Sequence, residues 1–247
     1  MSKNKYDYDA VVLIPTYNEA ENIRPLLEEI FSLPCNLAVV VLDDGSPDGT
    51  ADIVKKMTRT NEKLTLLTNP GKEGLGRAYL RGFRYVSKNI DAEFIITMDA
   101  DFSHDPSRIP RFLLAAREND LDLVAGSRYI RGGDTPDWDY RRRILSRTAN
   151  FYCQTLLGSK IHDYTSGFRC YRAQKLFYLD LTRVKSVGYG FMIEMASLFE
   201  RSGLRLGEIP IIFPDRKLGI SKLHGGIIKE AFLLVLRLAC RRFWSIL

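Results

Sequence analysis

The sequence has few of the features that mark secreted, membrane-spanning or disulfide-bonded proteins. Its four cysteines (Cys35, Cys153, Cys170 and Cys240) lie far apart and form no C-x-x-C pair, which indicates reduced thiols in a cytosolic protein. No apolar run approaches the ~18 residues that a membrane span requires. Residues 1–9 are too polar for a signal peptide, so we expect none.

Motifs that identify several common enzyme classes are also missing. The sequence has no G-x-x-x-x-G-K-[ST] motif and no G-x-S-x-G elbow, and the glycines of 71–76 do not form a dinucleotide-binding fingerprint. These absences exclude a P-loop and argue against a hydrolase. The three histidines, His104, His162 and His224, lack zinc-ligand spacing, and we expect each of them in a surface or loop position.

The 247 residues do contain a globular mixture, with 45% hydrophobic and 27% charged residues. A chain of this length folded as one unit buries roughly three quarters of its extended-chain surface, so it needs no disulfide or metal for stability. The net charge is +6, and the whole excess falls after residue 215, where seven Lys and Arg stand against one acid, Glu230. Such a tail suits nucleic acid, an anionic membrane surface or a phosphorylated substrate.

The first half of the chain alternates short apolar runs with amphipathic segments, which predicts a mostly parallel sheet with helices on both faces. The predicted strands are Val11–Ile14, Leu37–Leu42, Leu64–Thr68, Phe94–Met98 and Leu123–Ala125. The predicted helices are about Glu21–Phe31, Thr50–Thr60, Gly76–Lys88 and Pro106–Asn119.

The pattern changes after Ser127. Residues 128–140 combine turn formers, aromatics and charges without a period, and a loop of this length is uncommon unless it binds something or is disordered. The later elements are predicted as a helix at Arg141–Leu157, a strand at Gly167–Tyr171, a helix at Phe191–Arg201, a strand at Leu206–Ile212, a loop at Phe213–Leu223 and a helix at Gly226–Ile246. No repeat or linker interrupts the chain, so we expect one domain.

Acidic residues follow three of the predicted strands, at the edge of a parallel sheet where ligands bind. Asp99 and Asp101 follow the fourth strand, and because side chains alternate along an extended segment, both can point the same way. Two converging carboxylates repel one another unless a cation lies between them, and such oxygen ligands favour Mg²⁺ or Mn²⁺ held together with substrate phosphates. The alternative is that each acid only caps the following helix.

Other charged groups have two interpretations. Asp43 and Asp44 can accept hydrogen bonds from ribose hydroxyls or a base edge, or they can belong to an ordinary turn. Six arginines between Arg128 and Arg147, and the loop of 216–222, can bind phosphate or form a solvated basic surface. The modules dedicated to nucleic acid are missing, so we expect no nucleic-acid partner.

Five motifs in chain order carry a resemblance to a known family. They are P-T-Y-N-E at 15–19, D-D-G-S-P-D-G-T at 43–50, D-A-D-F-S-H at 99–104, G-S-R-Y at 126–129 and D-R-K-L-G-I-S-K at 215–222. The sequence resembles the polyprenyl-phosphate (dolichyl-phosphate) mannosyltransferases of glycosyltransferase family 2. The first and third motifs indicate the broad family, whereas the last motif and R-R-R-I-L-S-R-T-A-N-F at 141–151 are typical of enzymes with polyprenyl-phosphate acceptors.

The resemblance implies a single α/β domain of the Rossmann-like GT-A fold with a mostly parallel sheet. Residues 1–127 would bind the nucleotide sugar, residues 128–223 would face the acceptor, and residues 224–247 would form an amphipathic helix. The activity implied is transfer of mannose from GDP-mannose to a polyprenyl phosphate with the help of Mg²⁺ or Mn²⁺. The alternatives are a related transferase that uses UDP-glucose or another UDP-sugar, and a non-catalytic module that binds nucleotide sugar or nucleic acid.

The resemblance also implies roles for individual residues. Pro15, Tyr17, Glu19, Leu42 and Asp44 would bind the base and ribose of the donor. Asp99, Ala100 and Asp101 would hold the metal and the sugar nucleotide, with Ser103 where some relatives have a glutamine as a further metal ligand. Arg128, Arg216 and Lys222 would contact the donor diphosphate or the acceptor phosphate, Arg142 and Arg147 would bind the acceptor phosphate, and Asp101, Arg128 and Arg216 would be the catalytic residues.

The chemistry needs no general base, because a monophosphate ester is largely dianionic at pH 7 and can attack the anomeric carbon itself. Mg²⁺ would neutralise charge on the departing diphosphate, and arginines would hold two repelling phosphates together. A one-step displacement inverts the anomeric centre. Glu194 lies where relatives with hydroxyl acceptors place their base, and here we expect it to orient an arginine or the sugar.

The C-terminal segment from Gly226 to Leu247 has a narrow polar strip of Glu230, Arg237 and Arg241 on an otherwise apolar helix. A wide apolar face predicts core packing or a helix in a membrane interface, and the two alternatives stay open. The resemblance, with its lipid-linked acceptor, implies a cytoplasmic protein peripherally associated with the cytoplasmic face of the plasma membrane or endoplasmic reticulum, through this helix and with a small membrane-anchoring subunit as a further candidate partner.

Overall fold

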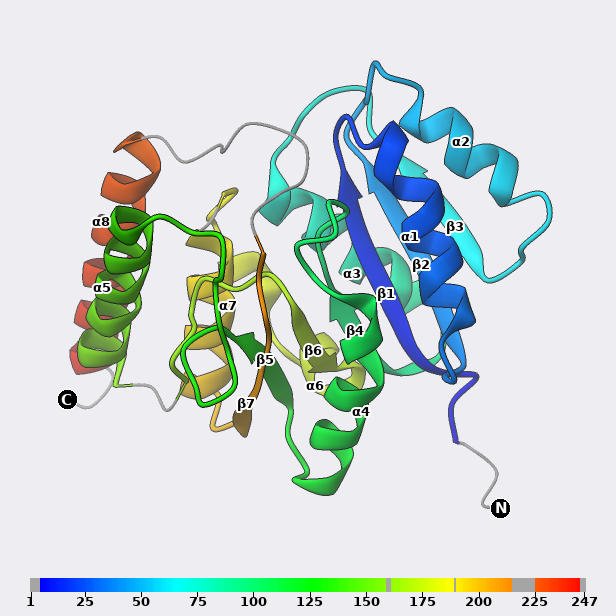
Figure 1. The fold of residues 1–247 in the computed structure, drawn as a ribbon. Helices are drawn as coiled ribbons and strands as arrows, with labels where there is room; N and C mark the ends of the chain where they lie inside the picture. Colours follow the sequence, from blue (N-terminus) through cyan, green and yellow to red (C-terminus); the bar gives the residue numbers. More distant parts are fainter. Residues whose placement is uncertain (1–4, 159–160, 189, 215–224, 245–247) are drawn as a thin grey trace.

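A seven-stranded sheet forms the centre of the computed structural model, which describes residues 5–158, 161–188, 190–214 and 225–244 (Figure 1). The strands lie in the order β3-β2-β1-β4-β6-β5-β7. All neighbours pair in parallel except β6, which is antiparallel to both β4 and β5. The strand bounds are β1 Tyr8–Thr16, β2 Leu37–Asp43, β3 Leu64–Thr68, β4 Ala92–Thr97, β5 Leu123–Ser127, β6 Arg169–Arg172 and β7 Leu206–Pro210.

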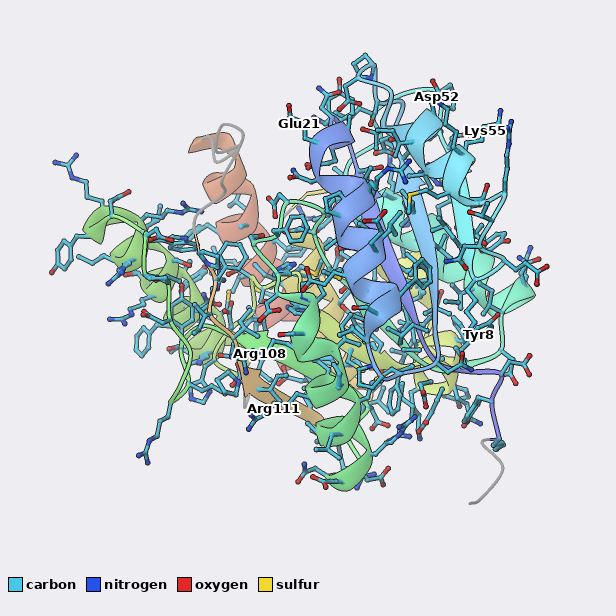
Figure 2. All side chains as sticks on the ribbon, turned by 45° about the vertical axis from the view of Figure 1, so that its right-hand side comes forward. Tyr8, Glu21, Asp52, Lys55, Arg108 and Arg111 are labelled. Carbon is cyan, nitrogen blue, oxygen red and sulfur yellow. The ribbon has the colours of Figure 1, made fainter. Side chains whose placement is uncertain are left out.

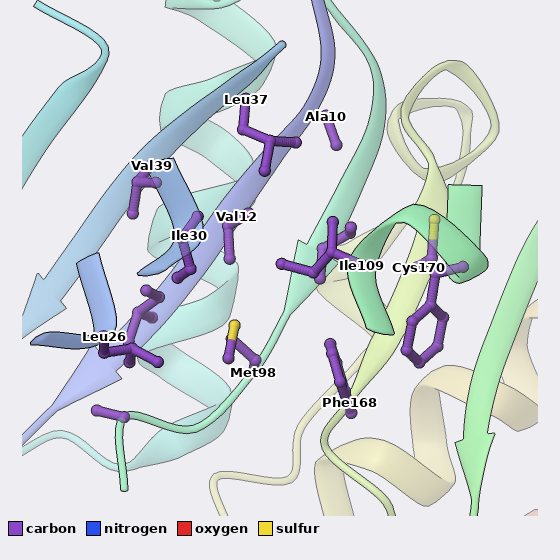
Figure 3. Packing of buried hydrophobic residues seen from close by; sticks show 14 of the residues in the cluster. Ala10, Val12, Leu26, Ile30, Leu37, Val39, Met98, Ile109, Phe168 and Cys170 are labelled. Carbon is purple, nitrogen blue, oxygen red and sulfur yellow. The ribbon is translucent and has the colours of Figure 1, made fainter. Parts of the chain in front are cut away.

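Helices cover both faces of the sheet, because its strands are apolar on both sides; every residue of β2, for example, is buried. On one face, side chains of α1 and α4 pack on alternate residues of β1, β2 and β4, as Figure 3 shows for Leu26, Ile30 and Ile109. On the other face, α3 and α7 pack on the remaining strand residues. The helix bounds are α1 Ala20–Ser32, α2 Thr50–Met57, α3 Leu75–Asn89, α4 Ile109–Glu118, α6 Ala173–Tyr178 and α7 Gly190–Arg201, with short 3-10 turns η1 Pro106–Arg108 and η2 Leu181–Arg183.

Polar side chains occupy the outward surfaces of the helices that cover the sheet. Figure 2 shows Glu21 on α1 and Asp52 and Lys55 on α2 at the surface, and all three are exposed. The amphipathic pattern of the sequence therefore fixes which side of each of these helices meets the sheet.

Two further helices, α5 (Tyr140–Leu157) and α8 (Gly225–Trp244), lie side by side at one end of the molecule (Figure 1). Leu234, Val235 and Leu238 of α8 are buried against Cys153 of α5 and Ile193 of α7. One side of the C-terminal helix therefore packs in the core, which is the first of the two alternatives predicted for it. Of its predicted polar strip, Arg237 is exposed, and the side chains of Glu230 and Arg241 lie outside the described residues.

The predicted α/β class with a mostly parallel sheet is confirmed, and the predicted elements match within a few residues. The helix predicted to Thr60 ends at Met57, because the hydroxyls of Thr58 and Thr60 bond back to the carbonyls of Lys55 and Met57 and compete with the helical pattern. The strand predicted to Ile212 ends at Pro210, which has no N–H to donate. The short elements α6 and η2 were not predicted, because six and three residues show no period.

No helix in the described part of the chain combines the length and the apolar composition needed to cross a bilayer.

The packing of α8 predicts a contrast between two leucines on one helix. Leu238 is 4% exposed and Leu236 is 39% exposed. We expect Leu238→Ala to lower the free energy of unfolding by about 2–5 kcal/mol, because it leaves a cavity between α8 and its neighbours. Leu236→Ala, the matched control, should change it by less than about 1 kcal/mol. Urea denaturation measures both; equal small losses would show that α8 is not part of the core.

Candidate active site

The loops that follow β1, β2 and β4 meet at the carboxyl edge of the sheet. The register pairs Thr16 of β1 with Asp43 of β2, so these two strands end at the same level, and β4 ends at Thr97, opposite Leu13 of β1 and three residues earlier. The strand order reverses between β1 and β4, which is the place where open α/β sheets bind ligands. The motifs predicted to bind the donor are therefore neighbours in space.

Hydrogen bonds tie the first two of these loops together. The N–H of Glu19 donates to Thr50 Oγ1 at 3.0 Å, and the N–H of Ala20 donates to Asp48 Oδ2 at 2.9 Å. Burial opposes ionisation of Asp48, but the bonds that it accepts from the Thr50 hydroxyl at 2.6 Å and from the Ala20 N–H hold its pKa below the usual range. The two bonds hold the loop after β1 against the loop after β2, and they thereby fix the position of Tyr17.

Asp43 and Asp44 have different functions, although they are adjacent. Asp43 is buried and its oxygens accept bonds from the N–H groups of Gly45 and Ser46 and from the hydroxyl of Thr16 at 2.9 Å. Gly45 and Ser46 belong to the turn itself, and Thr16 ends the neighbouring strand β1. The turn interpretation left open above therefore applies to Asp43.

Asp44 points away from that turn. Its Oδ1 lies 3.0 Å from Nη2 of Arg81 on α3, and its Oδ2 accepts a 3.3 Å bond from the N–H of Glu73. The Lys72 ammonium lies 4.3 Å from the ring centroid of Tyr17, over the same edge of the sheet. Asp44, Tyr17 and the cations beside them form a polar rim that suits a nucleoside.

The loop after β4 holds the paired aspartates. Asp101 is nearly buried, and its Oδ1 accepts bonds from the N–H and hydroxyl of Ser103 at 3.1 and 2.6 Å. The side chain of Asp99 is 28% exposed. Phe102 has a φ of +58°, an unusual conformation for a bulky residue, and it turns the loop sharply directly after Asp101. Ser103 thus orients Asp101 and stays a candidate metal ligand.

His104 lies in the loop after β4, as the prediction of a surface or loop position allows, but its side chain is buried. Its Nδ1 accepts a 2.9 Å bond from the N–H of Asp99, and Nδ1 therefore carries no proton in this bond. The ring packs on Phe168 and Phe213 at centroid distances of 5.0 and 5.3 Å. The histidine fixes the backbone of Asp99, a role that ligand spacing does not reveal.

Arg128 forms a buried, bidentate ion pair with Asp163. Its Nε and Nη2 lie 2.7 Å from the two carboxylate oxygens, and Nη2 also donates to Thr165 Oγ1 at 2.6 Å. Burial opposes ionisation of Asp163, but Arg128 holds the pKa of this carboxyl below its usual range. The predicted phosphate ligand Arg128 is thus fixed by a carboxylate that the sequence analysis did not identify.

Trp138 lies against two of the predicted phosphate-binding arginines. The guanidinium carbon of Arg142 is 3.8 Å from the ring centroid, and that of Arg128 is 5.2 Å from it. Arg142 is half-buried and Arg147 is exposed on the same helix, α5. Asp139 caps this helix by accepting a 3.0 Å bond from the N–H of Arg142. The loop before α5 therefore brings Arg128 and Arg142 together.

A chain of aromatic contacts joins the carboxylates to the arginines. Phe213 packs on His104, whose Nδ1 holds the backbone of Asp99, and its ring lies 5.7 Å from that of Trp138. The guanidinium of Arg128 is also 5.4 Å from the Phe213 ring. One site therefore contains both the acidic and the basic group.

Not every predicted residue presents its side chain to this site. Leu42 and Ala100 are buried in the core, so a donor can meet only their main-chain groups. Glu194 accepts bonds from the N–H groups of Lys185 and Ser186 at 3.0 and 2.9 Å. Its carboxylate therefore holds this backbone segment, whereas we expected it to orient an arginine or the sugar. Arg216, Lys222 and His224 lie outside the described residues.

The donor atoms suit a hard cation that substrate oxygens complete. In the described ranges, no three His, Cys, Asp or Glu side chains gather into a metal cage. Asp99, Asp101 and Ser103 offer oxygen only, and Mg²⁺ is commonly held by one or two carboxylates together with substrate phosphates. The residues present therefore fit a divalent ion that binds with a diphosphate.

Asp163 and Thr165 could not be recognised from the sequence motifs. Those motifs follow parallel strands, whereas β6 is antiparallel, so the segment that precedes it reaches the same edge. This segment supplies Asp163 and Thr165. A Cβ on Gly167 would lie 3.7 Å from Asp99 Oδ1, which confirms the proximity. The T-S-G-F-R sequence at 165–169, with its glycine, was the available signal.

The family of the chain follows from comparison with known proteins. Residues 11–177 match the model of "Glycosyl transferase family 2", which is more than half of the chain. The chain belongs to glycosyl transferase family 2. It is 40% identical over 222 residues to a polyprenol monophosphomannose synthase of Mycolicibacterium smegmatis, covering 90% of this chain and 83% of the relative. It is 39% identical over 236 residues to an undecaprenyl-phosphate mannosyltransferase of Micrococcus luteus, covering 95% and 96%.

Solved structures support the fold of this transferase. Glucosyl-3-phosphoglycerate synthase of Mycobacterium tuberculosis superposes with a TM-score of 0.68 at 18% identity, covering 94% of this chain and 80% of the neighbour. A mannosyltransferase of Pyrobaculum calidifontis superposes with a TM-score of 0.61 at 18% identity, covering 97% and 68%. The predicted GT-A fold and the resemblance to polyprenyl-phosphate mannosyltransferases are confirmed.

The buried ion pair predicts a pH-dependent loss of stability. Because the pKa of Asp163 is lower in the folded protein than in the unfolded chain, the pair stabilises the fold above the unfolded pKa of about 4. That stability is lost as the pH falls through the folded pKa. We expect Asp163→Asn to lower the free energy of unfolding by about 3–5 kcal/mol at pH 7, and the difference from wild type to shrink in acid.

Asp180→Asn is the matched control, since Asp180 also pairs with an arginine but is exposed. It should change the free energy of unfolding little at any pH. Denaturation across the acid range compares the variants, and a difference for Asp163→Asn that is small or constant with pH would contradict the assignment.

Proposed function

We propose that this transferase moves mannose from GDP-mannose to a polyprenyl phosphate. The observation that carries the proposal is the contact chain from His104, which holds Asp99, through Phe213 to Arg128 and Trp138. A carboxylate pair suits a metal and diphosphate, and arginines on the same site suit a second phosphate. Two relatives at about 40% identity bear the names of polyprenyl-phosphate mannosyltransferases, and one structural neighbour was solved with GDP-mannose and Mn²⁺.

The donor nucleoside would lie along the ends of β1 and β2. Tyr17 and Pro15 would contact the base, the main chain of Leu42 would border it, and Glu19 and Asp44 would accept ribose hydroxyls. The pair between Asp44 and Arg81 supports this assignment, because it holds the carboxylate at the rim of the site.

The sugar diphosphate would lie beside the loop after β4. Asp99, Asp101 and Ser103 would hold Mg²⁺ or Mn²⁺, with the main chain of Ala100 against the sugar nucleotide. The ion would offset the charge that develops on the leaving diphosphate. Asp101 would keep its orientation through the two bonds from Ser103.

The acceptor phosphate would bind on the arginine side, through Arg142 and Arg147, with Arg128, Arg216 and Lys222 at either phosphate group. A phosphate oxygen attacks the anomeric carbon as the bond from that carbon to the diphosphate oxygen breaks, and GDP leaves. The dianion needs no base, and Arg128 and Arg216 stabilise the charge transferred. Attack from the opposite side inverts an α-linked donor to a β-linked product.

The lipid-linked acceptor assigns the protein to a membrane surface. We expect peripheral association with the cytoplasmic face, through the C-terminal helix and in some settings a small anchoring subunit.

A transfer assay tests the function directly. The full chain is incubated with Mg²⁺, polyprenyl phosphate and radiolabelled GDP-mannose or UDP-glucose, and the lipid phase is counted. We expect label only from GDP-mannose, and only with a divalent ion present. Label from UDP-glucose alone would replace the donor assignment, and no labelled lipid with any donor would contradict the transferase proposal.

Removal of one carboxylate tests the metal site. Asp101→Asn should lower transfer at saturating metal by about 100-fold or more, because one anionic ligand is lost while the Ser103 bonds can persist. Asp105→Asn is the control from the same loop, since asparagine caps a helix as well as aspartate does. Both variants should keep the wild-type melting temperature within a few degrees, and a fully active Asp101→Asn enzyme would refute the assignment.

A further inference from the structure

Glu194, on helix α7, is a buried carboxylate that the proposed reaction does not use. The residue is 6% exposed, and its Oε2 accepts bonds from the N–H groups of Lys185 and Ser186 at 3.0 and 2.9 Å. A charged acceptor makes such bonds stronger than bonds between neutral groups. Helix α7 is itself fixed at this point, because the buried guanidinium of Arg169 donates to the carbonyl of Met192 at 2.6 Å. This backbone segment is therefore held against a fixed part of the core.

The same segment holds the start of helix α3. The carbonyl of Val187 accepts a 2.9 Å bond from the N–H of Gly76. A Cβ on Gly74 would lie 2.9 Å from that carbonyl oxygen, and a Cβ on Gly76 would lie 2.4 Å from the carbonyl oxygen of Ser186. Backbone atoms cannot accept a Cβ at these distances, so the close approach of the two segments requires both glycines.

The start of α3 carries the groups that surround the proposed nucleoside site. Just before the helix, the N–H of Glu73 donates to Asp44 Oδ2 at 3.3 Å. The ammonium of Lys72 lies 4.3 Å from the ring centroid of Tyr17. Within α3, Nη2 of Arg81 lies 3.0 Å from Asp44 Oδ1. A displacement of this helix start would therefore change all three contacts together.

We infer that Glu194 is a positioning residue for the sugar nucleotide, which acts on Asp44 through the backbone of 185–187 and the start of α3. The inference rests on the proposed function, since it takes the rim beside Asp44 as the site of the donor nucleoside. It differs from the role of a general base, which relatives with hydroxyl acceptors place at this position. Two backbone N–H groups already occupy Oε2 of the carboxylate, and a phosphate dianion needs no base.

Calorimetric titration of the full chain with GDP and Mg²⁺ tests this role without relying on turnover. Glu194→Gln keeps the shape of the side chain but removes its charge, so the two bonds to the backbone weaken. We expect the Kd for GDP to rise by about threefold to tenfold. Glu194→Ala removes the acceptor altogether and should raise the Kd further.

Asp122→Asn is the matched control. Asp122 is 5% exposed, and its Oδ2 accepts a 2.8 Å bond from the N–H of Arg205. It directly precedes β5, at the edge of the sheet opposite the site. This variant should bind GDP as wild type does, even where its melting temperature falls as far as that of Glu194→Gln. An equal loss of GDP affinity in both variants would overturn the inference.

Steady-state kinetics separates positioning from proton transfer. A positioning role predicts that Glu194→Gln raises the KM for GDP-mannose in step with the Kd for GDP. Its kcat should change by less than about threefold, and the pH profile of kcat should keep its shape. Loss of a general base would instead lower kcat by about 100-fold or more and leave the affinity for GDP unchanged. That result, or a wild-type Kd in both Glu194 variants, would overturn the inference.

Titration of the wild type with both GDP and UDP separates this inference from the proposed function. Binding of UDP alone would replace the donor assignment, and the same variants compared with UDP would then decide the role of Glu194. Binding of neither nucleotide would contradict the donor site and overturn the inference with it. Weaker nucleotide binding by the Glu194 variants, in a protein that transfers no sugar, would keep the positioning role and contradict the proposed transfer.

Discussion

One antiparallel strand decides how the site is assembled. In a fully parallel sheet, only the carboxyl ends of strands meet at the ligand edge, and they deliver the nucleotide loops and the paired aspartates. Because β6 runs the other way between β4 and β5, the segment before it reaches the same edge and supplies Asp163. The pair of Asp163 with Arg128 then fixes the start of the long loop that carries Trp138. The acidic and basic parts of the site owe their proximity to this reversal.

Aromatic rings lie between the acidic and the basic part of the site. Phe213 packs on His104, which holds the backbone of Asp99, and also on Trp138, against which Arg142 lies. Arg128 is already paired with Asp163, which makes its guanidinium a fixed hydrogen-bond donor rather than a mobile one. Such an arrangement suits a reaction between two phosphate-bearing molecules, since each needs cations of its own.

The sequence predicted most of the fold, because apolar runs and amphipathic helices follow from simple periodicity. It also predicted Asp44, Asp101 and Arg142 at the site, because each belongs to a motif beside a strand end or helix start. Asp163 and His104 could not be predicted in this way. Their roles depend on which direction β6 runs and on how a loop folds back under aromatic rings. The T-S-G-F-R sequence at 165–169 marks the segment beside Asp163, but it does not give the direction of the strand.

A crystal of the full chain soaked with GDP and Mn²⁺ gives the most direct test of the central claim. The account predicts an anomalous manganese peak bound by Asp99, Asp101 and the diphosphate, with the guanosine beside Tyr17 and Asp44. A diphosphate bound elsewhere, or a nucleotide bound at this edge with no metal beside Asp101, would contradict it.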